Sequence, residues 1–368
     1  MTYEGARSVT GPFLAILGAS GTAVGIVAGA GELAGYGLRL VSGYLSDRTG
    51  RYWTITLLGY GVNLLAVPLL AVSGRWETAG ALMIAERVGK AIRTPPRDAM
   101  LSHATTRTGI GWGFGLHEAL DQLGAVLGPL LVAAVLALRG DYRAGFAALL
   151  VPAALALALL GVARRLYPRP RDLEVETVGH LGDGFPREFW QYLAAAACIA
   201  AGYVDFPLIA YHFGKAGLAP ERWIPLAYAL AMGVDGLAAL TFGRLFDRHG
   251  IAALVLATVL SAAFPLLVFT GSFSLARLGM VLWGIGMGAQ ESILRGAVAK
   301  MVPPAHRASA YGVFNTGYGL AWFAGSALMG LLYDVSLAGL IAFSVALQLA
   351  AVPLLLGTHR QLRRPAHP

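Results

Sequence analysis

The sequence predicts an all-α membrane protein in which two six-helix bundles, related by pseudo-two-fold symmetry, contain eleven full spans and one partial first helix. Hydrophobic residues make up 57% of the 368 positions and charged residues only 13%, whereas a typical soluble domain has about 25% charged residues. A soluble α-helical protein would have to bury this apolar excess in one core, and soluble cores stop growing at about 250–300 residues. A lipid bilayer is therefore the predicted surroundings of the chain.

The membrane spans are predicted from apolar stretches of about 20 residues, the length that crosses a bilayer as a helix. The stretches of the first half lie near residues 22–43, 53–73, 78–96, 110–138 and 144–164. Those of the second half lie near 188–213, 224–243, 251–271, 275–298, 309–333 and 337–357. Ahead of them, residues 1–20 contain only a short apolar piece, from Gly11 to Leu17.

Basic residues are divided unevenly between the loops. Seventeen of the 28 lie near residues 44–52, 93–108, 164–187, 244–249, 299–308 and after 358, and six lie in the opposite breaks. Because lysine and arginine are retained on the cytoplasmic side, the first set of loops and the C-terminus are predicted to be cytoplasmic. The expected location is the plasma membrane, the inner membrane of a bacterium.

The polar stretch between the two groups of spans predicts how the chain is divided. We expect an N-terminal transmembrane bundle at 1–164, a cytoplasmic linker at 165–187, a C-terminal bundle at 188–358 and a cytoplasmic tail at 359–368.

Composition and motifs also exclude several classes of function. The net charge of +8 comes from loop residues between spans and not from a soluble basic face, so no nucleic-acid partner is expected. One cysteine allows no disulfide or cysteine-based metal site. No phosphate-binding loop or hydrolase motif is present, so the chain is expected to be neither ATP-driven nor an enzyme, and to need no cofactor or metal.

One loop motif occurs twice. Residues 43–51 read Gly-Tyr-Leu-Ser-Asp-Arg-Thr-Gly-Arg, and residues 243–250 repeat the pattern as Gly-Arg-Leu-Phe-Asp-Arg-His-Gly, a shift of 200 positions. This loop resembles the signature G-x-L-a-D-r-x-G-r of the major facilitator superfamily. Matched motifs in two halves are typical of secondary transporters, which hold their substrate between repeats near the membrane midplane.

The resemblance implies a monomeric secondary transporter that moves a small solute across the lipid bilayer by alternating access, with protons as the coupling ion. It also implies a gating role for the two loops, through Gly43, Asp47, Arg48, Gly50, Arg51, Gly243, Asp247, Arg248 and Gly250. The family normally has twelve helices, and its signature loop follows the second. Thr2–Ala19 is therefore expected to be the outer half of helix one, with the inner half missing.

The direction of transport is predicted from a second, looser resemblance. Gly115, Gly124, Gly128 and Pro129 match the spacing of the antiporter motif on the fifth helix, although its closing glycine pair is replaced by Val132 and Ala133. This match favours efflux by antiport, although small residues on one stripe also simply allow close helix packing. Proton-coupled uptake of a small metabolite is the alternative. A non-transporting membrane enzyme or receptor-like relative is the alternative from another class.

Ionisable residues within the predicted spans are the candidate substrate and proton sites, because such residues are costly in lipid and normally face a cavity. The candidates are Tyr3, Glu4, Arg7, Glu32, Tyr36, Arg87, His117, Glu118, Asp121, Asp205, Glu291 and Arg295. Glu291 and Arg295 are alternatively a structural ion pair. On the fourth helix, the basic residues from Arg87 to Arg97 would either attract an anionic substrate or anchor the helix end near Pro95 and Pro96.

Overall fold

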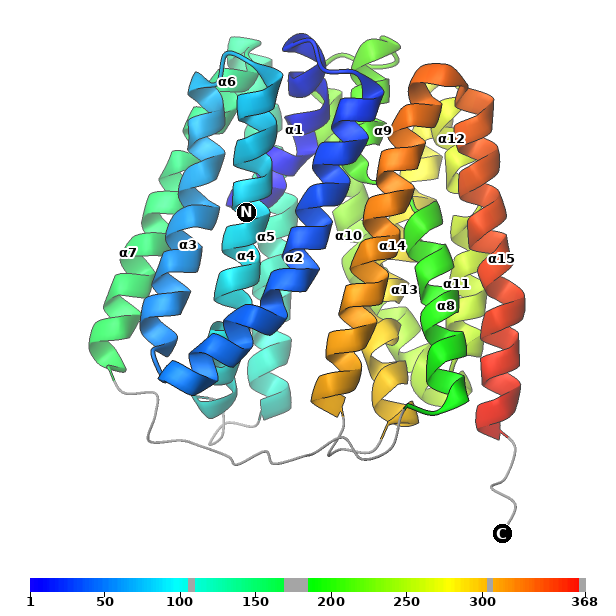
Figure 1. Ribbon diagram of the computed structural model, residues 1–368. Coiled ribbons are helices and arrows are strands. Elements are labelled where there is room, and N and C mark those ends of the chain that lie inside the picture. The colour runs from blue at the N-terminus through cyan, green and yellow to red at the C-terminus, as the bar shows by residue number, and fades with distance from the viewer. Residues whose placement is uncertain (105–109, 169–184, 303–306, 364–368) are drawn as a thin grey trace. The chain divides into compact units, whose positions relative to one another are not determined.

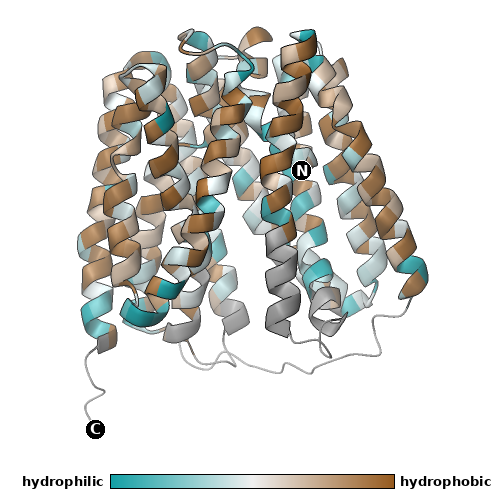
Figure 2. Cartoon of the chain, turned by 180° about the vertical axis from the view of Figure 1, so that it is seen from behind, coloured by the Kyte–Doolittle hydropathy of each residue, from teal (hydrophilic) through white to brown (hydrophobic). Residues whose placement is uncertain are grey.

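The protein is described by a computed structural model that covers residues 1–104, 110–168, 185–302 and 307–363 (Figure 1). Every regular element in these ranges is helical, which confirms the predicted all-α class. Hydrophobic residues cover most of each helix, and hydrophilic ones gather toward the helix ends and loops (Figure 2).

In the first half of the chain, the helices follow the predicted spans closely. A short helix, α1 (Thr2–Ile16), comes first; its 15 residues are about 22 Å long, less than a full span. The others are α2 (Gly21–Thr49), α3 (Tyr52–Leu69) with the 3₁₀ turn η1 (Leu70–Val72), α4 (Trp76–Ala104), α5 (Ile110–Arg139), α6 (Tyr142–Ala148) and α7 (Leu150–Leu166).

The second half follows its predicted spans in the same way. Its helices are α8 (Arg187–Gly202), α9 (Phe206–Lys215), α10 (Trp223–His249), α11 (Ala252–Ser261), α12 (Phe264–Phe269), α13 (Phe273–Met301), α14 (Arg307–Val335) and α15 (Leu337–Arg363).

Three predicted spans are divided into two helices each, namely α6 with α7, α8 with α9, and α11 with α12. In every case the second helix has a proline within its first three residues: Pro152, Pro207 or Pro265. Proline has no N–H to donate to the carbonyl four residues earlier, and its ring clashes with that carbonyl. The helix therefore stops and restarts at these positions.

Eight helical stretches in the described part of the chain are long and apolar enough to cross a membrane, by length and composition. They include the divided pairs, each taken as one stretch. The other three predicted spans are α4, α13 and α14, each 29 residues or about 43 Å long, so their length suffices but they are more polar.

The chain forms two compact units. Unit 1 consists of Met1–Glu176 together with Phe206–Ala229, so α9 and the start of α10 are packed with the first half of the chain. Within it, α4 lies against α2 and α3, and α1 lies against α5 and α9. Unit 2 consists of Thr177–Asp205 and Leu230–Pro368, and α8 packs there against α14 and α15. The division into bundles at residues 165–187 stays a prediction.

Glycine allows α3 and α4 to approach closely in unit 1. A methyl group added to Gly59 would lie 2.6 Å from the backbone nitrogen of Arg93, and one added to Gly89 would lie 2.7 Å from the carbonyl oxygen of Gly59. Small residues at such crossings are the usual means of bringing membrane helices into contact. This contact holds Asn63 of α3 beside Glu86 of α4, which the site described next requires.

Candidate functional site

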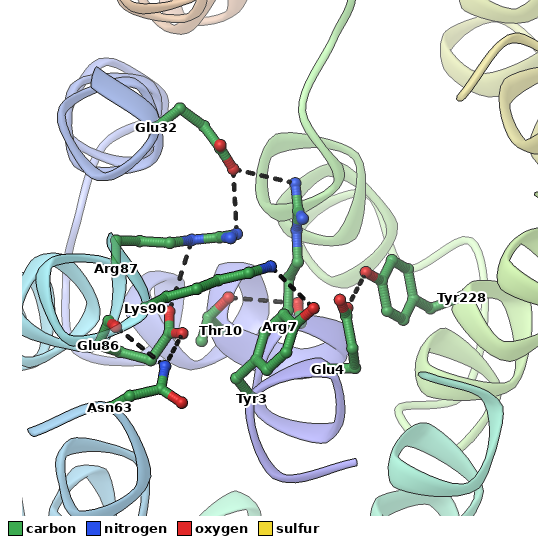
Figure 3. A network of polar contacts seen from close by, with 10 residues as sticks. All are labelled: Tyr3, Glu4, Arg7, Thr10, Glu32, Asn63, Glu86, Arg87, Lys90 and Tyr228. Carbon is green, nitrogen blue, oxygen red and sulfur yellow. Dashed lines mark hydrogen bonds and ion pairs between the residues drawn. The ribbon is translucent and has the colours of Figure 1, made fainter. Parts of the chain in front are cut away.

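Polar side chains from five helices of unit 1 lie close together in a cluster, shown in Figure 3. Helix α1 contributes Tyr3, Glu4, Arg7 and Thr10; α2 contributes Glu32; α3 contributes Asn63; α4 contributes Glu86, Arg87 and Lys90; and α10 contributes Tyr228. On α1, Glu4, Arg7 and Thr10 are three positions apart, and on α4, Arg87 and Lys90 are three positions apart, so each helix presents them on one face.

Glu32 connects three helices through its carboxylate. Its Oε1 atom lies 3.1 Å from a terminal nitrogen of Arg87 and 3.5 Å from one of Arg7. The three side chains are only 10–13% exposed. Charges held this far from water interact strongly, so this carboxylate ties α1, α2 and α4 together.

Glu86 is held by both a cation and an amide. Arg87 Nε lies 3.5 Å from Glu86 Oε2, while Asn63 Nδ2 donates to Glu86 Oε1 at 2.7 Å and to its backbone carbonyl at 3.0 Å. Each carboxylate oxygen of Glu86 therefore has a partner, and α3 is attached to α4 at this depth.

Glu4 has a different kind of partner. Its Oε2 atom accepts a hydrogen bond from the hydroxyl of Tyr228, which is neutral. Glu4 also shares a hydrogen bond with Tyr3 and interacts electrostatically with Arg7 and Lys90, but it forms no ion pair among the described residues. The residue is 7% exposed. Tyr228 in turn packs its ring against Phe206 of α9, with the centroids 4.3 Å apart. Glu4 is thus the carboxylate of the cluster that contacts α10.

Lys90 lies over Tyr3. Its ammonium nitrogen donates to the Tyr3 hydroxyl at 2.8 Å and is 4.1 Å from the centroid of that ring. No carboxylate among the described side chains forms an ion pair with it. The cluster therefore holds one cation whose observed partners are a phenol and an aromatic face.

The structure brings together five of the predicted cavity residues: Tyr3, Glu4, Arg7, Glu32 and Arg87. Tyr36 of α2 is not part of the cluster; its ring lies 5.0 Å from the guanidinium carbon of Arg39. Asp121 of α5 is exposed and acts electrostatically on Lys90 without pairing with it. The side chains of His117 and Glu118, also on α5, lie outside the described ones.

The predicted residues of unit 2 lie at different places in the sequence of helices. Asp205 is 3% exposed and lies between α8 and α9. Glu291 on α13 is exposed, and the side chain of Arg295 lies outside the described ones, so their predicted pairing stays a prediction. The buried polar contacts here involve other residues, such as Tyr318, whose hydroxyl donates to Gln290 at 2.9 Å.

The two signature loops end their helices in the same way. Gly50 closes α2 and Gly250 follows α10, with left-handed φ angles of 58° and 64°. The N–H of Gly50 donates to Ser46 at 2.7 Å and that of Gly250 to Phe246 at 2.8 Å. Such a left-handed residue is a common helix ending, and glycine adopts it without a Cβ clash.

The other motif residues have few contacts in the structure. Arg48, Arg51, Asp247 and Arg248 are exposed, and the side chain of Asp47 lies outside the described ones. A methyl group on Gly43 would lie 3.5 Å from Pro95 of α4, and one on Gly243 would lie 3.9 Å from Ser292 of α13, both ordinary contact distances. The predicted gating role of these residues stays a prediction.

Five residues of the cluster were not among the predicted cavity residues: Thr10, Asn63, Glu86, Lys90 and Tyr228. Asn63 is a lone amide in an otherwise apolar span, and that isolation was a usable signal. Tyr228 is one of 14 tyrosines and carries no such signal. The cluster also includes Glu86 and Lys90, which the sequence places on the fourth helix without assigning them to the cavity.

Comparison with known proteins identifies related chains over almost the whole sequence. The family profile described as Major Facilitator Superfamily matches residues 2–326 and 192–366. An uncharacterized protein of Mycobacterium tuberculosis is 45% identical over 360 residues, which cover 96% of this chain and 88% of the relative. An uncharacterized MFS-type transporter of Methanocaldococcus jannaschii is 26% identical over 334 residues, or 87% of this chain and 82% of that protein.

Solved structures with the same fold have much lower sequence identity. A bacterial homolog of the human lysosomal transporter Spinster, in an inward-facing and occupied conformation, matches with a TM-score of 0.77 at 15% identity and covers 100% of this chain and 96% of that chain. A nucleoside transporter matches with a TM-score of 0.73 at 14% identity, over 98% and 95% of the two chains. At these identities the likeness shows the fold alone.

Proposed function

The chain belongs to the major facilitator superfamily and is a secondary transporter, and on that premise we propose that it couples the movement of a small solute to protons through Glu4. The observation that carries the proposal is the pairing of this carboxylate. Glu4 is 7% exposed, lies in the cluster of Figure 3, and accepts a hydrogen bond from the neutral Tyr228.

A proton carrier in a membrane protein must exist in both protonation states without losing its surroundings. A protonated Glu4 retains a hydrogen bond with Tyr228, because a carboxylic acid and a phenol can each donate or accept. No ion pair of the described residues is broken by this step. The hydrogen bond between Glu4 and Tyr228 can therefore persist in both protonation states.

The other two carboxylates of the cluster are poorer carriers by the same argument. Protonating Glu32 would leave Arg87 and Arg7 without the oxygen that lies 3.1 and 3.5 Å from them. Removing one partner of a buried ion pair costs about 3–5 kcal/mol. We therefore propose that Glu32 stays ionised and positions the arginines, and that Glu86 is restrained by its hydrogen bonds with Asn63.

Proteoliposomes containing a pH-sensitive dye would test the coupling. Solutes are added outside at a fixed pH, and those that change the internal pH are taken as substrates. We expect Glu4→Gln to abolish this proton movement, because an amide cannot bind the coupling proton, while exchange of labelled solute across the membrane continues.

The matched control for this experiment is Glu77→Gln, which removes a carboxylate that is 47% exposed and pairs with Arg75 at 3.1 Å on the surface. Its proton movement should equal that of the unchanged chain. Proton movement that persists in Glu4→Gln contradicts the proposal. A chain that moves none of the solutes, in any variant, would instead favour the alternative of an enzyme or receptor-like relative.

The direction of transport stays a prediction. The glycine pattern of α5 favours export, but in this structure Gly124 and Gly128 lie against Met1 and Gly5 of α1, so close packing of α5 on α1 already accounts for them. The sign of the pH change in the same vesicles distinguishes antiport from symport, since a symported proton enters with the solute.

We further propose that the two signature loops act in gating and that they lie on the cytoplasmic side of the plasma membrane. The repeated motif and the distribution of basic residues support this. Asp47→Ala should slow transport without reducing membrane insertion, whereas full activity of this variant would contradict the gating role. A cysteine introduced at Arg48 should react with a membrane-impermeant thiol reagent only in opened cells; reaction in intact cells would reverse the orientation.

A further inference from the structure

We infer that Lys90 and Tyr3 form the binding subsite of an anionic solute, a carboxylate or phosphate monoanion, and that this anion binds together with the proton on Glu4. The inference rests on the proposed function, because it names the class of solute for that same site. It begins from the donors that Lys90 presents and from the charge balance of the cluster.

An ammonium group has three hydrogen-bond donors, and the described protein atoms accept one from Lys90, at Tyr3 Oη. The Tyr3 hydroxyl accepts this bond at 2.8 Å and also shares a hydrogen bond with Glu4, so the subsite adjoins the proposed proton carrier. Both groups are supported by rigid helices, α1 and α4. A carboxylate or phosphate oxygen is the partner that such a set of donors favours, because charge-assisted hydrogen bonds are the stronger ones.

One turn further along α4, Arg93 adds a second cation. It is 6% exposed, its guanidinium carbon lies 4.4 Å from the ring centroid of Tyr60, and its Nε atom has no hydrogen-bond partner among the described residues. By contrast, Arg97 at the end of the same face is paired with Asp98 at 2.7 Å. Lys90 and Arg93 therefore lie against aromatic rings and form no ion pair among the described residues, which leaves them available to an anion.

The charge of the cluster links the anion to the proton. Three cations (Arg7, Arg87 and Lys90) balance three carboxylates (Glu4, Glu32 and Glu86) when all are ionised. A proton on Glu4 leaves one positive charge in excess, and a monoanion restores neutrality. Because an uncompensated charge at membrane depth is costly, each of the two ligands favours the binding of the other.

Other titratable groups lie around α1 and do not remove this linkage. Arg7 on the same helix is already paired with Glu32. Asp121 on α5 is exposed and acts electrostatically on Lys90, and the amino group of Met1 interacts electrostatically with Glu4, Asp121, Lys90 and Arg93. The groups near the C-terminal half of α1 are Arg143 on α6 and His212 and Lys215 on α9. Binding of proton and anion together corresponds to symport, so this inference favours uptake over the export that the α5 glycines suggest.

The test measures anion binding to the full chain purified in lipid-free detergent micelles, where no proton or solute gradient exists. Lactate, benzoate and inorganic phosphate are titrated at constant ionic strength, and the rise in unfolding temperature is followed. Lactamide and benzamide serve as neutral probes of the same shape. A separate titration with phosphatidylglycerol tests whether the bound anion is a lipid headgroup instead of a soluble solute.

We expect at least one soluble anion, and neither amide, to stabilise the chain. In Lys90→Met the half-saturating concentration should rise at least about tenfold, since a hydrogen bond to a charged group is lost. Lys90→Arg should retain most of the binding. Tyr3→Phe, which keeps the ring, should weaken binding several-fold, and it serves as the readout if Lys90→Met does not fold.

The matched control is Lys215→Met. Lys215 also donates to a tyrosine hydroxyl, that of Tyr211 at 3.3 Å, but it is exposed at the end of α9. Its removal should leave anion binding unchanged. Lactate and benzoate stay monoanionic between pH 8 and pH 6, so they are the probes for the pH dependence. The unchanged chain should bind them more tightly as the pH falls, and Glu4→Gln should bind them equally at both pH values.

Several results would overturn the inference: stabilisation by the amides as strong as by the acids, anion binding that survives in Lys90→Met, an effect of the lipid alone, or no response to any of the three anions. Failure of the proposed function is a separate outcome. Anion binding without proton movement in vesicles would contradict the proton coupling and support the anion subsite. Proton-coupled movement of a neutral solute would support the coupling and contradict the anion subsite.

Discussion

The ion pairs of Glu32 provide the most quantitative test of the structure. Glu32→Gln preserves the shape of the side chain and removes the charge that faces Arg87 at 3.1 Å and Arg7 at 3.5 Å. Loss of one partner from a buried ion pair destabilises a protein by about 3–5 kcal/mol. Because Arg87 retains Glu86 at 3.5 Å, we expect a value near the lower limit, about 3 kcal/mol.

The assay is a denaturant titration of the purified chain in detergent, followed by the loss of helical circular dichroism. Glu77→Gln is the control, because it breaks a pair of the same 3.1 Å length whose members are 76% and 47% exposed. It should produce no measurable change, as is usual for surface pairs. Adding Arg7→Gln to Glu32→Gln should recover about 1 kcal/mol or more, since it removes the cation left unpaired. If Glu32→Gln is no more disruptive than Glu77→Gln, the ion bridge does not hold these helices together.

Three further predictions concern the turns, the loops and the packing. Gly50→Ala and Gly250→Ala should each destabilise the chain by about 1 kcal/mol, because both positions are left-handed; equal stability in thermal unfolding would mean that the loops relax. Burial and the charge of Asp141 raise the pKa of Glu221, so the folded state binds this proton more tightly than the unfolded chain and loses that advantage as the pH rises. Glu221→Gln should therefore raise the unfolding temperature at pH 7 and have little effect near pH 4; a pH-independent difference would contradict this. Gly89→Ala should cost about 1–3 kcal/mol through overpacking, and an unchanged unfolding temperature would show that α3 and α4 are not in close contact.

The helices could be predicted well from the sequence, because the signal that determines them is local. Each of the eleven predicted stretches coincides with a helix or a divided helix, and the two glycine turns occur where the repeated motif places them. Apolar length and turn residues depend only on neighbouring positions. The interruptions that divide three of these spans into two helices were less evident from the sequence, since prolines such as Pro207 and Pro265 lie within stretches that are otherwise continuously apolar.

The partners of the charged residues could not be predicted in the same way. Helical spacing places Glu4 and Arg7 on one face of α1, but it does not show which helices face them. The pairing of Glu32 with Arg87, and not with Arg39 on its own helix, depends on how α2 and α4 pack. Likewise, Tyr228 is 224 positions away from Glu4. Such contacts are properties of the tertiary structure.

The participation of residues 206–229 in unit 1 has a consequence for how the protein is made. The ribosome synthesises α1 before α10, and the hydroxyl that bonds Glu4 belongs to a residue 224 positions later in the chain. The Tyr211 hydroxyl, which donates to the backbone carbonyl of Ala19, likewise belongs to a residue 192 positions later in the chain. Until α10 enters the membrane, the Glu4 carboxylate of α1 lacks this hydrogen bond. The helices of unit 1 therefore complete their assembly only after α10 has begun to insert. Expression of the first 168 residues alone should yield a product that is inserted but remains open to proteolysis at α1.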